Sequence, residues 1–526
     1  MRTPRLLAVP FLLLALAACK KAPPPERFIA GDTAMAVVVP SLSSFAAQAT
    51  NVLDTVATFP GGQNVGDARA VAESRLGFDL LDGGSLAKAG FDPKRGAAMG
   101  FRMDEGGRPE MVATLPAGDA KKVAATLDVL AKDRLQLELR STEEGKPEIV
   151  KWGPKDGPAM LAYAFAEKTV IVGTGPTALP LVQAALKVPN DGHLGTKPDY
   201  KAALDATGAG QAVVWYFSAQ GPMFEMPQLA PLREMFKKGF ALGLSGAKDR
   251  VAFAVGMPLH DESPFLKMGK ADAGPLVARL DPNAGWVARS DTDAATTFEF
   301  QKPMLRNMLE SMGAPEEFRK AVDGVFGAVA GGTAMSVGVV PVEAGTPSIR
   351  EAPLAFFRAE LLVGIEDPAK MKEALRGLVK EGPKMPPGEE LDLSGDGPWT
   401  FPAGGGEVGV AVEDKQLLLV AGPTGSLKAL AARSGTTFEP PTATATKALQ
   451  GSMGGMYIDF PKIAGGLKVI PASAYGDDPH GTVLQSNVQK VASVLSRFTA
   501  VSVSADVKGK TYHGELVVEV APPAAK

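Results

Sequence analysis

The sequence of 526 residues predicts an α+β protein made of two similar tandem units, each a mainly antiparallel sheet built from hairpins with helices packed on it. Three observations support this fold class. Apolar strand patterns occur in pairs whose turns are too short for a parallel crossover. Amphipathic helical segments stand between these pairs. The same order of patterns occurs in residues 28 to 259 and again in residues 280 to 521.

The chain begins with a segment typical of a secretory signal. Arg2 and Arg5 precede a short apolar stretch, and small residues follow it. The apolar stretch is shorter than the roughly 20 residues that a mature membrane-spanning helix needs. Residues 1 to 18 are therefore expected to be removed by cleavage between Ala18 and Cys19.

The stretch Leu16-Ala17-Ala18-Cys19 resembles the lipobox of bacterial lipoproteins. This resemblance implies that the Cys19 sulfur receives diacylglyceryl and that the new N-terminus is commonly acylated too. Several acyl chains on one residue give stable anchoring. Cys19 is the only cysteine of the chain, so it is predicted to be a lipidation site rather than a nucleophile or metal ligand. A signal peptide that merely contains a cysteine is the alternative.

Residues 19 to 27 are predicted to form a tether, because three consecutive prolines favour an extended chain. Lys20 directly follows the cysteine. By resemblance to enterobacterial lipoproteins, the absence of Asp there implies release to the outer membrane, facing the periplasm, with surface exposure left open. Lys20 and Lys21 are also placed to contact anionic headgroups, although a solvated linker is the simpler account.

Composition restricts the expected partners. The sequence holds 55 Lys and Arg against 58 Asp and Glu, with the signs mixed throughout. No basic stripe with interleaved aromatic residues is present, which argues against nucleic-acid binding. The expected partners are the membrane, through the anchor, and an envelope protein or lipid.

The first two matches between the units each combine a strand with a helix. Residues 30 to 45 match residues 281 to 298, where an apolar strand runs into polar residues able to start a helix. Residues 111 to 133 match residues 359 to 382, again a strand followed by a helix. Amphipathic helical segments are expected after the first strand of each unit.

The helices of the second match have a buried stripe and an N-terminal cap in both units. Asp119 and Asp367 stand at the helix starts, where a carboxylate accepts backbone N–H bonds. Apolar residues at a spacing of three to four positions predict one buried face for each helix: Val123, Leu127 and Leu130, and Met371, Leu375 and Leu378.

The remaining matches predict hairpins. In residues 159 to 186 and 406 to 433, a strand, a turn, a second strand, a Gly-Pro-Thr junction and a helix follow one another. Their turns are expected at Glu167-Lys168 and Asp414-Lys415.

Each unit then closes with two further matched segments. Residues 210 to 223 match residues 454 to 467, and the hairpin at 239 to 259 matches that at 498 to 520. The closing turns are expected at Lys248-Asp249 and Gly509-Lys510.

Residues 260 to 279 are predicted to link the units, and residues 522 to 526 to form a flexible tail. This order of patterns resembles a poorly characterised group of bacterial envelope proteins that carry duplicated domains of unknown function. The resemblance implies no activity.

Several short motifs resemble catalytic or cofactor sites. Gly173-x-Gly175 has the local form of a dinucleotide fingerprint, but its strand belongs to a predicted hairpin and the matching junction at Gly422 lacks the pattern. Residues 509 to 511 resemble the end of a phosphate loop whose first glycine is replaced by Ser504. Residues 83 to 87 are a partial nucleophile-elbow pattern without the strand that such a turn requires. Turns and helix starts explain all three motifs better.

Metal binding has little support in the sequence. The four histidines are scattered and are interpreted as surface or turn residues, and the loops at residues 392 to 397 and 476 to 481 as ordinary turns. Met304, Met308 and Met312 share one helical face. This face is interpreted as a core stripe, with a copper site of thioethers as the alternative.

The sequence thus predicts a lipid-anchored cell-envelope protein with a non-enzymatic binding or scaffolding role, no catalytic residues, no cofactor and no metal. The alternative is a periplasmic carrier of lipid or another apolar molecule, since residues 221 to 236 are rich in Met, Phe and Pro. A hydrolase whose site assembles from distant residues is a third hypothesis without local support.

Overall fold

The computed structural model describes residues 23–57, 64–103, 109–219, 221, 236–342, 345–382, 392–433, 438–440, 442–476 and 478–521. The predicted signal segment, Cys19 and the predicted tail lie outside these residues, as does most of the Met- and Phe-rich segment.

The strands of the first half alternate apolar residues along short runs of chain. They are β1 (Met35–Val39), β2 (Ala97–Met103), β3 (Pro109–Pro116), β4 (Leu139–Glu143), β5 (Ile149–Gly153), β6 (Leu161–Ala166), β7 (Thr169–Thr174), β8 (Val213–Phe217), β9 (Phe240–Ala247) and β10 (Arg250–Pro258).

The second half contributes the remaining described strands. They are β11 (Trp286–Ser290), β12 (Val329–Val339), β13 (Phe357–Ile365), β14 (Trp399–Ala403), β15 (Gly406–Glu413), β16 (Gln416–Gly422), β17 (Gly454–Asp459), β18 (Phe498–Lys508) and β19 (Thr511–Val520).

Helices stand between the strands in both halves. In the first half and the connection they are η1 (Pro25–Phe28), α2 (Leu42–Ala57), α3 (Asn64–Leu76), α4 (Gly83–Lys88), α5 (Ala120–Val129), η2 (Leu130–Arg134), α6 (Ala178–Leu186), η3 (Leu194–Thr196), α7 (Pro198–Ala206), α9 (Pro264–Lys267) and α10 (Gly274–Val277). In the second half they are α11 (Ala294–Ser311), α12 (Glu316–Phe326), η5 (Pro353–Ala355), α13 (Pro368–Glu381), α14 (Ser426–Ala431), α15 (Ala443–Ala448), α16 (Phe460–Lys468), η6 (Ala472–Tyr475) and α17 (Pro479–Leu495).

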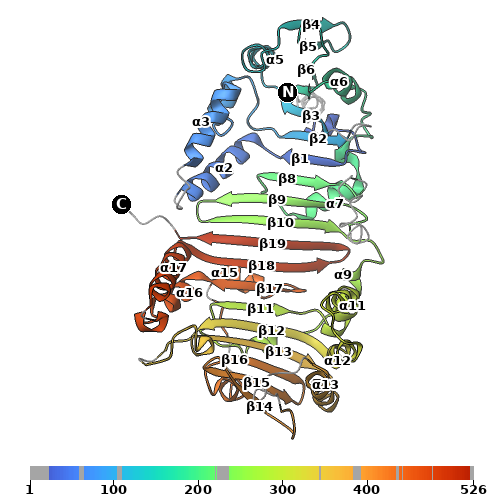
Figure 1. The fold of residues 1–526 in the computed structure, drawn as a ribbon. Helices are drawn as coiled ribbons and strands as arrows, with labels where there is room; N and C mark the ends of the chain where they lie inside the picture. The colour runs from blue at the N-terminus through green and yellow to red at the C-terminus, as the bar shows by residue number, and fades with distance from the viewer. Residues whose placement is uncertain are drawn as a thin grey trace, which may run out of the picture.

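All described strands belong to one sheet, and every strand pair in it is antiparallel (Figure 1). The order in the first half is β4-β5-β6-β7-β3-β2-β1-β8-β9-β10. In the second half it is β14-β15-β16-β13-β12-β11-β17-β18-β19. The halves join where β10 pairs with β19, from Arg250 opposite Glu519 to Pro258 opposite Thr511.

The predicted antiparallel α+β fold is therefore confirmed, together with local details. The four predicted hairpin turns join β6 to β7, β9 to β10, β15 to β16 and β18 to β19. Asp119 accepts hydrogen bonds from the backbone N–H groups of Lys121 and Lys122, and Asp367 caps α13 in the same way. The helical segments after the first strand of each half are α2 and α3, and α11 and α12.

Helices cover one face of the sheet along most of its length. α6 packs on β6 and β7, α7 on β8 to β10 and β19, α14 on β15 and β16, and α15 on β17 and β18. The side chains beneath them are small and buried, such as Ala36, Ala241 and Ala254. Gly256 allows a close approach of α7, because a Cβ there would meet the Ala203 carbonyl oxygen at 2.4 Å. This side is called the covered face.

The opposite face is covered chiefly over the outer strands of each half. Val123 and Leu127 of α5 pack on Tyr163 and Val172 in the first half. Met371 and Leu375 of α13 form the equivalent cluster with Val363 and Leu417 in the second.

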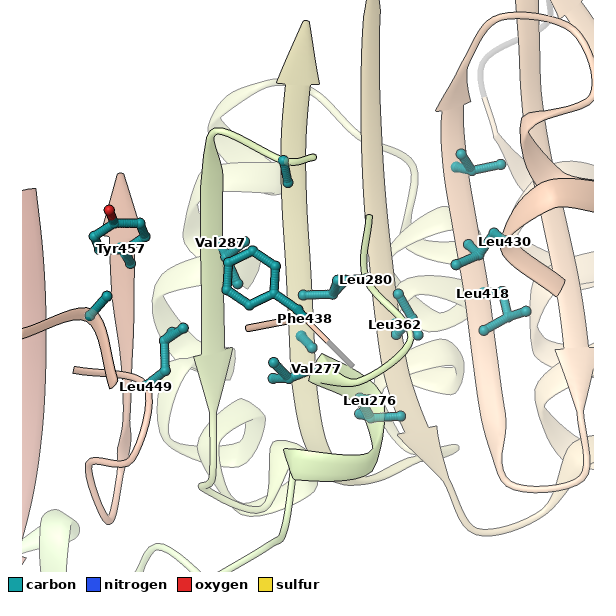
Figure 2. Close-up of a cluster of buried hydrophobic side chains, with 14 of the residues drawn as sticks. Leu276, Val277, Leu280, Val287, Leu362, Leu418, Leu430, Phe438, Leu449 and Tyr457 are labelled. Atoms are coloured by element: carbon teal, nitrogen blue, oxygen red, sulfur yellow. The ribbon is translucent and has the colours of Figure 1, made fainter. Parts of the chain in front are cut away.

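The segment predicted as a linker contains α9 and α10. Leu276 and Val277, at its end, are buried in the core of the second half. Figure 2 shows them with Leu280, Phe438 and Leu362. At least the last residues of this segment therefore belong to the second half's core.

Candidate functional site

The described chain starts four residues after Cys19 and is held firmly to the body from that point. An Nη of Arg95 donates to the Pro23 carbonyl oxygen at 3.5 Å, and the Thr114 hydroxyl donates to the Pro25 carbonyl. Residues 25 to 27 of the predicted tether form η1 together with Phe28, and Glu26 and Phe28 are buried. Residues 23 to 27, which the sequence assigns to the tether, therefore contact the folded body.

Glu26 lies in a buried polar cluster below this segment. The Tyr200 hydroxyl donates to its carboxylate. Burial raises the pKa of Glu26, although the bond from Tyr200 opposes that rise. The pKa of Tyr200 is also raised, first by burial and then by the Glu26 charge.

His193 is beside the same cluster. The histidines are predicted to be surface or turn residues, whereas His193 is buried in a β-bridge that directly follows a turn. Its side chain is buried, and Nδ1 has no hydrogen-bond partner in the described structure. Burial, with the nearby charges of Arg27 and Lys201, lowers the pKa of His193. The backbone of His193 pairs with residues 29 and 30, because Ala30 forms an antiparallel bridge with His193 and the Leu194 N–H donates to the Ile29 carbonyl oxygen at 2.8 Å.

The second feature is a continuous apolar surface on the central strands, opposite the covered face. Directly paired residues share one face of an antiparallel sheet, so the register defines this surface. The apolar face consists of Trp215, Leu242, Leu244, Val251, Phe253, Val255, Leu516, Val518, Val501, Val503, Met456 and Ile458.

All of these side chains are partly exposed, and Phe253, at the junction of the halves, is 48% exposed. Every one is apolar. α2 borders this face at Gly246, where a Cβ would meet Val52 at 2.5 Å. A contiguous exposed apolar surface of this kind is typical of a binding site.

A hollow of about 280 Å³ lies on the covered face of the first half. Phe28, Val112 and Leu181 are among the apolar residues that line it. Arg102 and Glu110 contribute charged groups to the lining. Arg102 Nε donates to Glu110 at 2.7 Å. Apolar walls with a few polar groups can bind a small amphiphile, but this set holds no activated nucleophile with a neighbouring base.

At the matching position of the second half, an ion-pair network fills the space. In each half, one line of directly paired residues crosses four neighbouring strands at this position. In the first half the line is Val112, Gly100, Ala36 and Tyr216, and in the second half it is Glu360, Ser336, Val287 and Tyr457. The Glu360 side chain is fully buried. It accepts from Arg433 at 2.8 Å, from the Ser336 hydroxyl at 3.1 Å and from the Asp281 N–H at 2.9 Å.

The glycine motifs take the structures predicted for them. Gly173 is the next-to-last residue of β7, the second strand of a hairpin, and Gly175 turns the chain with φ +85° before α6. Gly509 lies in the turn between β18 and β19. Ser85 lies in α4, where its hydroxyl accepts from the Asp79 N–H at 2.9 Å and Asp82 caps the helix. Each geometry is accounted for by local turns and caps.

The prediction that Met304, Met308 and Met312 form a core stripe is wrong. Their exposed fractions are 71%, 50% and 74%. Their helix α11 buries Phe298 on a different part of its surface, stacked on Phe326. Periodicity correctly places the three methionines on one face, but it does not show whether another element covers that face.

In the described ranges, no three His, Cys, Asp or Glu side chains are grouped so that they could hold a metal ion. None of the described helices combines the length and the apolar character needed to cross a bilayer.

Sequence reasoning missed the apolar face and the Glu360 network. Alternation along strands such as Phe240–Ala247 signals a half-buried strand. A face becomes visible only when the strand order and register are known, because its residues come from strands far apart in the chain.

No family model matches this chain, and no curated protein matches it. Among solved structures, it is similar to TP0453 in crystal form III, with 9% identity over 47% of this chain and 86% of the other, and a TM-score of 0.24. Crystal form IV of TP0453 matches at 9% identity over 46% and 83% of the two chains, also with a TM-score of 0.24.

Proposed function

We propose that this protein is a lipid-anchored cell-envelope lipoprotein that binds an acyl-chain lipid on its apolar face and has no catalytic role. Cys19 is the lipidation site, and the body faces the periplasm from the outer membrane. The observation that carries the binding role is the apolar face itself, which runs across the junction of the halves without a polar side chain.

The chemistry of this face favours a lipid over a polar ligand. The row Trp215, Leu242 and Val255 offers only ring, methyl and methylene surface. An extended acyl chain gains roughly 0.8 kcal/mol for each CH₂ group that it buries. A polar ligand would lose hydrogen bonds to water there without replacing them. This is the reason for preferring the lipid carrier to a general scaffold.

Binding is tested with a fluorescent fatty acid titrated into the acylated protein purified in a mild detergent. Phe253→Asp is expected to weaken binding at least about tenfold, since burying a Phe side chain contributes about 1.5–3 kcal/mol. The matched control is Val469→Asp, at an exposed valine that directly follows α16 and is not one of the residues that define the apolar face. Equal affinities of both variants and the unchanged protein would reject the proposal.

The anchor is tested separately, with full-length protein and a Cys19→Ala variant expressed in a diderm host. The mass of the N-terminal peptide should show acylation of Cys19, and the protein should sediment with outer membrane. An unmodified protein cut elsewhere would reject the anchor and leave the apolar face to be explained in a secreted protein.

We also propose that the halves arose by tandem duplication, with units at residues 28 to 259 and 280 to 521. The matching strand orders support it, as does the equivalence of Tyr216 and Tyr457 in register. If this holds, Leu242 and Val503 are equivalent positions of the apolar face. Each pairs with the closing strand of its half, at Val255 and Leu516.

A scaffolding role remains the second candidate, and the exposed methionine stripe of α11 favours it. Flexible thioether side chains adapt to varied protein surfaces. Replacing Met304, Met308 and Met312 by Gln should then abolish cross-linking to an envelope protein without changing fatty-acid affinity. Unchanged cross-linking would exclude this stripe as the contact.

A further inference from the structure

The residues around Pro23 form a basic surface, here called the anchor end. It includes side chains from η1, from the loop before β2, from the start of α5 and from the turn between β6 and β7: Arg27, Lys94, Arg95, Lys121, Lys122 and Lys168. Arg95 links these segments, because its Nη1 donates to the Lys168 carbonyl at 2.8 Å and its Nη2 to Pro23.

Nearby carboxylates already have local partners. Asp92 accepts from the Lys94 N–H at 3.1 Å, and Asp119 caps α5. Glu167 is 3.5 Å from Arg27. Lys94, Lys121, Lys122 and Lys168 are exposed. The anchor end therefore presents more basic than acidic groups, although the whole chain holds more acidic residues.

The chain length outside the described structure indicates what this surface faces. Cys19 is four residues before Pro23, so its Cα can lie at most about 14 Å away. An acylated Cys19 would hold the anchor end against the membrane surface. A hollow of about 520 Å³ lies there between Arg95, Phe165, Ala120 and Lys168.

We propose that the anchor end docks on anionic phospholipid headgroups and so fixes which side of the body faces the membrane. This proposal rests on the proposed lipid anchor. Basic residues at an anionic surface contribute about 1 kcal/mol each, or roughly a fivefold change in binding. The anchor supplies attachment, and the anchor end supplies orientation and preference for anionic lipid.

The second half offers a matched control. Lys370 stands three residues after the capping Asp367, as Lys122 stands after Asp119, and Lys415 lies in the turn equivalent to Lys168. There the acidic groups outnumber the basic ones, since Glu366 precedes the cap and Glu413 and Asp414 directly precede the turn lysine.

The test uses the mature chain from residue 19 with Cys19→Ser, so that no acyl chain contributes, and measures flotation with vesicles. The chain should bind vesicles containing about 30% phosphatidylglycerol and release them at about 0.5 M salt. Lys122→Gln combined with Lys168→Gln should lower the partition coefficient about 25-fold. The control pair Lys370→Gln and Lys415→Gln should leave it within about twofold.

Equal loss in both double variants, or equal binding to neutral phosphatidylcholine vesicles, would overturn the proposal. Release by about 10 mM inorganic phosphate at constant ionic strength would also overturn it, by assigning the surface to a free anion. The result is independent of acylation, so a failure of the Cys19 prediction is seen in the peptide mass and not in this assay.

Discussion

The two halves differ most on the covered face and agree most on the apolar face. At one position of the covered face, the first half leaves a hollow beside Val112, and the second half buries Glu360 with Arg433. On the opposite face, both halves present apolar side chains in register, such as Leu242 and Val503. The same order of strands is therefore compatible with different side chains beneath the helices. The apolar surface proposed to bind lipid occurs in both halves.

The largest expected effect comes from breaking the buried ion pair of the second half. Arg433→Ala leaves the fully buried Glu360 without its cation, which should cost about 3–5 kcal/mol of unfolding free energy. Arg102→Ala is the comparison in the first half. Its partner Glu110 is also largely buried, but Glu110 lines the hollow, where water can solvate it, so this change should cost less than Arg433→Ala. Urea unfolding measures both. Similar losses would show that the two positions are energetically alike.

The agreement on the apolar face is tested by Leu242→Ser and Val503→Ser, one in each half. Each removes a partly exposed apolar side chain from an equivalent row. Each is expected to lower fatty-acid affinity about tenfold, to a similar extent, as measured by fluorescence titration. An effect confined to one half would mean that the binding surface is not shared.

A third prediction concerns the side-chain hydrogen bonds that hold α5 and α13 in place over the outer strands of the two halves. Asp128 of α5 accepts from Trp152 Nε1 at 2.9 Å and from the Tyr163 hydroxyl at 2.7 Å. Asp128→Ala leaves both donors unpaired and should cost about 1–3 kcal/mol.

The second half supplies the control for this change. Arg376 of α13 stands as many residues after the capping Asp367 as Asp128 stands after the capping Asp119. Its side chain donates to the carbonyl oxygens of Leu393 and Gly395. Arg376→Ala should cost less than Asp128→Ala, because water can replace a donor to partly exposed carbonyls. Equal losses by thermal unfolding would contradict this difference.

The smallest expected effect is a pH dependence specific to the first half. Burial raises the pKa of Glu26 in the folded state. Between its ordinary value and that raised pKa, the folded state retains a proton that the unfolded state has lost, so stability falls as pH rises through this window. Glu26→Gln should flatten that decline. Identical melting profiles of the two proteins over pH 4.5 to 8 would refute it.

Much of the local structure follows from short stretches of sequence. Glu167-Lys168 and Gly509-Lys510 turn hairpins because two residues that favour turns stand between runs of apolar alternation. Asp119 and Asp367 predict helix starts because a carboxylate there meets unpaired N–H groups. These signals act over a few residues and need no knowledge of the rest of the fold.

The candidate sites depend on contacts between distant residues. Strands such as β1 are apolar on both faces, so alternation does not tell which face a helix covers. The methionines of α11 show the same limit, since their spacing fits a core stripe but nothing buries them. The pairing of β10 with β19 joins residues about half the chain apart, and no local pattern indicates it.

The most direct test of the central claim is photo-cross-linking with a diazirine fatty acid in the acylated protein, followed by mapping of the labelled peptides. Lipid binding on the apolar face predicts labels within β9, β10, β18 and β19, which are lost in the Phe253→Asp variant. Labels confined to the hollow beside Leu181, or labels that Phe253→Asp leaves unchanged, would contradict it.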